Sequence, residues 1–255
     1  YKIMLAPIVG ALFEDRPILF SRVFLVAVYF TWDAGYDGLF MSHLLEKKES
    51  EMVISRTQFE TVRKELGGHT SWAVWSPEGA IPKSNVGDLS IFNDEEKLTT
   101  TLKKLNPDIV LAGLNASTGD ITDTSGVIPF ANFHSNWFRA MDFKIRFATI
   151  GTALEGAFMT DIIKHHYETD SNVVGRDLRT NPDYERLKVE EFFEEITILS
   201  RSPIIFAFGG MGYELIQKYN NNRFRVYKLF HYAFTMSKEK FRKETISTLK
   251  LAGLA

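Results

Sequence analysis

Apolar runs that alternate with helical segments constrain the fold of this chain more than any other feature. Four runs have the length and composition of buried strands, at residues 108–114, 156–164, 203–208 and 224–230. Apolar residues recur at helical spacing in residues 51–66 and 184–199. Strands that alternate with helices predict a parallel sheet with helices on both faces. We therefore expect an α/β domain with three layers, αβα, around a four-stranded, mostly parallel sheet.

Local signals add further elements to this outline. Residues 71–75 are expected to form a short strand, and Asp94 or its neighbour Asn93 can cap a helix that runs to Leu105. A short helix is expected to begin at Ser135, and Ser237 is expected to cap a C-terminal helix. Residues 115–135 and 165–183 are polar and predict loops, and a loop as long as the first is usually functional.

The first part of the chain differs from the rest in composition. Residues 1–40 are rich in apolar side chains, but the longest uninterrupted run, residues 23–30, is shorter than the ~20 residues of a membrane span. No signal peptide is evident, so an intracellular location is expected. We predict an apolar extension of unknown role at residues 1–50, with Met41 as a possible natural start, and one domain at residues 51–255. Binding of the extension to a membrane surface remains an alternative, although a membrane partner is not expected.

Composition limits the chemistry that the domain can perform. The chain has 255 residues and no cysteine, which excludes disulfides, a cysteine nucleophile, iron–sulfur clusters and thiolate zinc sites. The formal net charge is −2, so binding to nucleic acid would need a local basic patch. Residues 223–250 supply such a patch with eight Lys and Arg side chains, although a charge run is more often a solvated helix face.

Polar residues follow two of the predicted strands at the point where each strand ends. Asn115 follows the strand at residues 108–114, and His231 follows the strand at residues 224–230. In open α/β sheets, ligands bind beyond the carboxyl ends of the strands. The sequence therefore predicts that these two side chains face one site.

Five segments, in order, resemble the motifs of the uracil-DNA glycosylase superfamily, and in particular its mismatch-specific uracil/thymine branch. Residues 113–117 (Gly-Leu-Asn-Ala-Ser) are similar to Gly-Ile-Asn-Pro-Gly, and residues 129–138 to a stretch that begins Pro-Phe-Ala. Residues 160–164 (Thr-Asp-Ile-Ile-Lys) resemble a strand that ends in Thr-Asn before an apolar pair and Lys. Residues 190–209 match a helix followed by a Pro-Ile-Ile strand, and residues 231–233 (His-Tyr-Ala) stand where His-Pro-Ser is common.

The resemblance implies a monofunctional DNA base-excision glycosylase, a hydrolase that cleaves the N-glycosidic bond of an extruded base. It implies that Asn115 orients the attacking water and that His231 donates a hydrogen bond to the departing base. The implied partner is DNA, bound by a monomer without metal or other cofactor. The base-binding residues carried over from the motifs are Gly113, Leu114, Phe130, Phe133 and Asp161, with Phe130 as the ring that stacks on the base and Phe133 as the alternative. The DNA-binding residues are Ser117, Tyr232, Phe234, Lys238 and Lys240.

This chain departs from the family pattern at the base-reading position, where Asp161 replaces Asn. An ionised carboxylate only accepts hydrogen bonds, so it would repel O4 of uracil or thymine and accept from the amino group of another base. A protonated Asp161 would serve uracil if its pKa were raised. We therefore expect a preferred base that carries an amino or other donating group. Tyr232 and Ala233 also replace the Pro and Ser of the second motif.

Two other functions remain open. The domain can be a catalytically weak module of the same fold that binds nucleic acid or nucleobases, which the altered second motif favours. It can also be an unrelated α/β nucleotide hydrolase, which would need a metal site from Asp120, Asp123 and Asp161.

Overall fold

A computed structural model of the chain describes residues 54–116, 128–137, 139–164, 166 and 168–255. The chain divides into a unit of residues 1–41 and a unit of residues 42–255. The first unit and the predicted boundary at residue 50 lie outside the described residues. The described helices and strands follow the order α2 (Arg56–Glu65), β1 (Thr70–Trp72), α3 (Ser90–Asn93), α4 (Glu95–Leu102), β2 (Asn106–Asn115), α5 (Asp142–Thr149), β3 (Ala157–Ile163), α6 (Ser171–Thr180), α7 (Pro182–Ile196), β4 (Ile204–Phe208), α8 (Gly210–Asn220), β5 (Val226–Leu229) and α9 (Lys238–Ala252).

The strands form one mixed, five-stranded sheet, which corrects the predicted four-stranded and mostly parallel one. The strand order is β1-β3-β2-β4-β5. β1 pairs antiparallel with β3, whereas the pairs β2–β3, β2–β4 and β4–β5 are parallel. The short strand expected at residues 71–75 is thus an edge strand of the same sheet. Its apolar pattern predicts a strand but not the direction in which that strand pairs.

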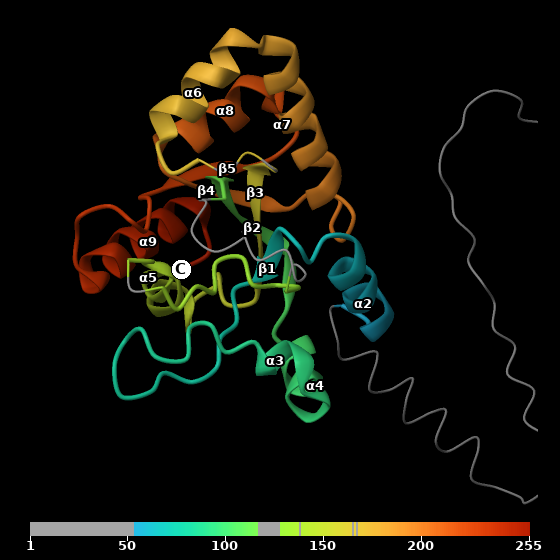
Figure 1. The fold of residues 1–255 in the computed structure, drawn as a ribbon, viewed down its shortest axis with the longest axis vertical. Coiled ribbons are helices and arrows are strands. Elements are labelled where there is room, and N and C mark those ends of the chain that lie inside the picture. The colour runs from blue at the N-terminus through green and yellow to red at the C-terminus, as the bar shows by residue number, and fades with distance from the viewer. Residues whose placement is uncertain (1–53, 117–127, 138, 165, 167) are drawn as a thin grey trace, which may run out of the picture. The chain divides into compact units, whose positions relative to one another are not determined.

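Helices cover both faces of the sheet, as an α/β domain requires (Figure 1). β2 alternates between two apolar cores: Val110 and Ala112 belong to one, Ile109 and Leu111 to the other. The first core includes side chains from α2, α4, α6, α7 and α8. The second core packs β2, β4 and β5 against α5 and α9, and we call this side of the sheet the α5/α9 face. Because both faces are buried, β2 is apolar along most of its length rather than alternating with polar residues.

The helices show where local signals suffice and where they do not. The side chain of Asp94 caps α4 by accepting hydrogen bonds from the backbone N–H groups of Glu96 and Lys97, as predicted. The helix expected at Ser135 begins instead at Asp142, and the loop expected at residues 165–183 contains α6. Within the described part of the chain, every helix is too short or too polar to cross a bilayer.

Candidate functional site

The carboxyl ends of three neighbouring parallel strands bring the two predicted catalytic side chains to one edge of the sheet. Ala112 of β2 pairs with Ala207 of β4, and Ala207 pairs with Lys228 of β5. β2 ends at Asn115, and His231 follows the last residue of β5 by two positions. β4 lies between these two strands, so both side chains lie at the carboxyl edge of the sheet.

Gly113 marks a close approach just before the end of β2. A Cβ atom at this position would overlap Oδ1 of Asp161 and would lie 3.2 Å from Cζ of Phe133. Gly113 pairs with Asp161 across the parallel strands β2 and β3. Only glycine therefore lets the Asp161 carboxylate and the Phe133 ring meet over β2, on the α5/α9 face to which Phe133 belongs.

Asp161 is a buried acid at the centre of this arrangement. Its side chain is 3% exposed, and its Oδ2 accepts a hydrogen bond of 2.9 Å from Nδ2 of Asn132. Burial raises the pKa of Asp161 to about 6, although the Asn132 hydrogen bond and the nearby charge of Lys164 oppose that rise. Asp161 is thus mostly ionised at neutral pH and takes up a proton in mildly acidic solution.

A buried polar network lies beside Asp161, and the sequence motifs did not predict its members as a group. Glu195 of α7 accepts a hydrogen bond of 2.6 Å from Oγ1 of Thr160 and lies 3.2 Å from Nζ of Lys164. Its other carboxylate oxygen lies 3.2 Å from Nε2 of His69. Burial alone would raise the pKa of Glu195, but these three partners together hold that pKa below its ordinary value. Burial lowers the pKa of Lys164.

Asn115 is fixed by its amide nitrogen. Nδ2 donates to the backbone carbonyls of His166 and Glu168, at 2.8 Å each, and to that of Ala116 at 3.1 Å. Oδ1 of Asn115 accepts no hydrogen bond from the residues that the structure describes. The hydrogen bonds of Nδ2 therefore give the amide a defined orientation.

The backbone around His231 defines which ring nitrogen carries a proton. The backbone N–H of Ala233 donates to Nδ1 of His231 over 3.1 Å. Burial lowers the pKa of His231, which favours the neutral ring. A neutral imidazole that accepts at Nδ1 carries its proton at Nε2, so His231 can donate a hydrogen bond from Nε2.

Tyr232 packs into the site rather than away from it. Its ring stacks on His231 with centroids 4.5 Å apart, and it meets the edges of Phe208 and Phe133 at 5.3 and 6.3 Å. Tyr232 therefore forms an aromatic wall with Phe133. Tyr232 and Phe234 were both predicted to bind DNA, but they differ in position: the Tyr232 ring packs inward. Phe234 is 56% exposed, and its ring centre lies 6.0 Å from that of the exposed Phe230.

Two predicted base-binding residues lie on the other face of the sheet. Leu114 and Phe130 both belong to the core that faces α2, α7 and α8. The Phe130 ring is fully buried between the rings of Phe59 and Phe92. Phe130 has a left-handed backbone, with φ of 64°, and its ring packs away from the site that Phe133 reaches. The alternative ring, Phe133, is thus the one beside Gly113.

The remaining predicted residues lie on α9 or outside the described residues. Lys238, at the start of α9, places its ammonium 4.4 Å from the centre of the Phe147 ring, and Lys240 is exposed. Ser117, Asp120 and Asp123 lie outside the described residues. Among the residues that are described, no group of three or more His, Asp or Glu side chains is arranged to hold a metal ion.

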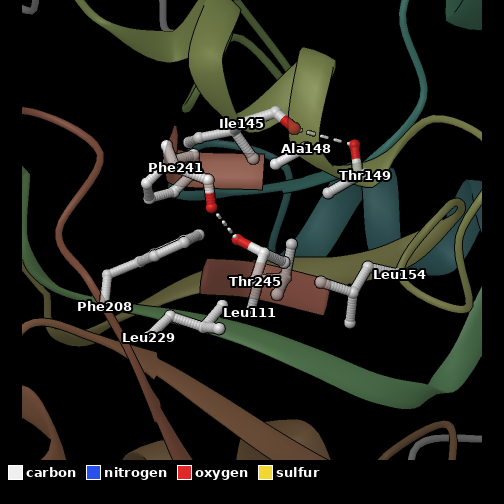
Figure 2. A pocket seen from close by; sticks show the side chains of 9 residues that line it. All are labelled: Leu111, Ile145, Ala148, Thr149, Leu154, Phe208, Leu229, Phe241 and Thr245. Atoms are coloured by element: carbon white, nitrogen blue, oxygen red, sulfur yellow. Dashed lines mark hydrogen bonds between the residues drawn. The ribbon is translucent and has the colours of Figure 1, made fainter. Parts of the chain in front are cut away.

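A narrow gap in the core lies next to the site but has different chemistry (Figure 2). It is lined mainly by apolar side chains between the sheet and helices α5 and α9. One of these side chains is Phe208, whose ring contacts Tyr232 of the aromatic wall. Its hydroxyl groups, on Thr149 and Thr245, donate to the backbone carbonyls of Ile145 and Phe241 at 2.9 Å each. With its polar groups satisfied internally, this gap is a feature of core packing and offers a ligand no polar partner.

No family model, curated protein or solved structure matches the chain.

Proposed function

We propose that this chain is a monofunctional DNA base-excision glycosylase with a three-layer αβα fold of the uracil-DNA glycosylase type. The observation that supports the proposal is that Asn115 ends β2 and His231 closely follows β5, at the carboxyl edge of one sheet. Asp161 and Phe133 lie between β2 and β3 on the α5/α9 face. This combination offers a donor, an oriented amide oxygen, a carboxylate and an aromatic wall to one planar base.

Each of these groups has a role in breaking an N-glycosidic bond. The departing base gains negative charge, and Nε2–H of His231 would stabilise that charge through a hydrogen bond. The sugar gains positive charge, and Oδ1 of Asn115 would hold a water against its anomeric carbon. An amide is a poor base, so Asn115 orients the water rather than deprotonating it. Phe133 would stack on the base, as aromatic side chains do with bases of many kinds.

The exposed aromatic pair and the basic helix would contact the DNA around the extruded base. Phe230 and Phe234 stand out from the turn that follows β5, and an apolar wedge of this kind can fill the gap that a flipped base leaves. Lys144 donates to the backbone carbonyl of Phe234 over 3.0 Å and so fixes this turn. Lys238 and Lys240 follow directly on α9 and would contact phosphates.

The test is the release of bases from DNA that contains modified, mismatched and ordinary bases, measured by mass spectrometry. The wild-type protein is expected to release at least one base, and Asn115→Ala and His231→Ala are each expected to slow release about 100-fold or more. Gln217→Ala, an exposed change on α8, is the matched control and should leave release unchanged. Release at the wild-type rate by the two site variants would overturn the assignment of these residues.

A second candidate function is favoured by the inward packing of Tyr232. Because its ring already contacts His231 and Phe133, the domain can instead be a catalytically weak module that binds nucleic acid or nucleobases. An oligonucleotide assay separates the two functions. Catalysis produces alkali-labile sites in the strand, whereas binding alone produces only a shift in mobility.

A further inference from the structure

One oxygen of the buried Asp161 side chain has no hydrogen-bond partner among the residues that the structure describes. Oδ2 accepts from Asn132, but Oδ1 accepts no hydrogen bond from any residue within the described ranges. Nearly all buried polar atoms in folded proteins are hydrogen-bonded, to protein or to an ordered water or ligand. Within the described residues, Oδ1 of this 97% buried side chain is therefore an acceptor that still lacks a donor.

The position of this oxygen shows where the donor would come from. Oδ1 lies over Gly113, in the space that a Cβ atom would need, and Cζ of Phe133 borders the same point. Phe133 in turn contacts the ring of Tyr232. The unpartnered oxygen is thus on the α5/α9 face, against the aromatic wall on which a planar ring would stack.

Neighbouring groups fix both the orientation and the charge of the carboxylate. Nδ2 of Asn132 also donates to the backbone carbonyl of His69, so the Asn132 amide cannot rotate freely. The ammonium group of Lys164 is held 3.2 Å from Glu195 and places a positive charge near Asp161. These contacts keep Oδ1 as a hydrogen-bond acceptor.

We propose that Oδ1 of Asp161 accepts a hydrogen bond from an exocyclic amino group of the extruded base. This inference rests on the proposed function. The substrates are then bases of the cytosine, adenine or guanine type, ordinary or modified. Uracil, thymine and hypoxanthine would place a carbonyl oxygen against the carboxylate. Because a carbonyl oxygen cannot donate to the buried carboxylate, we expect bases with an amino group to be released roughly 10- to 100-fold faster than bases with a carbonyl oxygen there.

The test uses pairs of bases that differ only in an amino group replaced by a carbonyl oxygen. Oligonucleotides carry cytosine or uracil, 5-methylcytosine or thymine, and adenine or hypoxanthine at one position, opposite each of the four bases and in single strands. The wild-type protein should release the amino member of a pair faster, and Asp161→Asn, which can donate from its amide, should reverse the preference. Asp183→Asn, a change at an exposed side chain, is the control.

The outcomes separate this inference from the proposed function. Faster release of the carbonyl member by wild-type protein, or an unchanged preference in Asp161→Asn, overturns the inference and leaves the glycosylase intact. If Asp161→Asn does not fold, the wild-type ratio alone decides. If no base is released, the proposed function fails, and calorimetric titration with free cytosine and free uracil decides the inference. Tighter binding of cytosine supports it, and equal, weaker or absent binding of cytosine overturns it.

Discussion

The carboxyl group of Asp161 can be ionised or protonated within the mildly acidic to neutral pH range. Its pKa of about 6 arises mainly from burial, which disfavours the charged form. Above pH 6 the carboxylate is ionised and only accepts hydrogen bonds. Below pH 6 the protonated acid gains an O–H donor, which a carbonyl oxygen of a base can accept. In the proposed site, the same side chain would therefore favour different bases on the two sides of this pKa.

We expect the ratio of cytosine release to uracil release to fall as the pH is lowered from 8 to 5. The ratio should be constant well above pH 6 and should decrease by up to about tenfold per pH unit below it, because the ionised fraction falls at that rate. The ratio of the two release rates cancels any titration that changes both rates equally, such as that of His231. Single-turnover rates measured across this range provide the check.

Asp161→Asn is the control for this pH dependence, since an amide does not titrate. Its release ratio should stay constant between pH 5 and pH 8. A wild-type ratio that rises towards low pH would contradict the role of Asp161, and so would a fall of equal size in the Asn variant.

At the scale of an element, α9 connects the turn that carries His231 to the second core. The helix begins after Ser237, whose Oγ accepts a hydrogen bond of 3.2 Å from the backbone N–H of Lys240. Phe241 and Leu249 of α9 are buried against the sheet and α5. The start of the helix is thus held by its cap, and its middle is held by apolar packing.

Ser237→Ala is expected to lower the free energy of unfolding by about 1 kcal/mol, because it removes the acceptor for one helix-end N–H group. Urea unfolding followed by circular dichroism measures this loss. Ser247→Ala, within the same helix, is the matched control: its exposed hydroxyl donates only to the carbonyl of Lys243. A loss of equal size in both variants would show that the cap has no special contribution.

Across the whole molecule, the sequence predicted those features that depend on local pattern. The apolar runs predicted β2 to β5, and the ends of β2 and β5 placed Asn115 and His231 at one edge. The antiparallel pairing of β1 was not predictable in the same way, since it depends on the path of the chain through the sheet. α6 was missed because its mixed polar sequence resembles a loop, although Val174 and Leu178 are buried.

The composition of the site itself depends on contacts that no short segment encodes. Phe130 and Phe133 are three residues apart and both have a left-handed backbone, yet their rings enter different cores. Lys164, directly after β3, meets Glu195 of α7, which is 31 positions further along the chain. The sequence carries little signal for this pair, because Glu195 follows Glu194 and Lys164 precedes His165, as in solvated segments.

The charge of the whole molecule determines how it would hold DNA. The net charge is −2, so the proposed binding to DNA would have to depend on a local surface, for which we propose α9. Beyond Lys238 and Lys240, this helix borders a shallow hollow lined by Phe147, Glu239, Arg242, Lys243, Ile246, Ser247 and Lys250. Arg242 is committed to the backbone carbonyls of Phe147 and Ile150 and therefore fixes α9 against the end of α5.

If Lys238 and Lys240 each contact a phosphate, the affinity for duplex DNA should depend on salt through them. The double variant Lys238→Gln, Lys240→Gln should reduce the slope of log K against log salt concentration by about 1.8, which corresponds to about 0.9 for each lost contact. Fluorescence anisotropy at about four salt concentrations between 50 and 300 mM measures this slope. The double variant Lys64→Gln, Lys103→Gln removes the same charge from α2 and from the turn after α4, so it separates a phosphate contact from a change in net charge. Equal slopes for the two double variants would place the DNA elsewhere on the molecule.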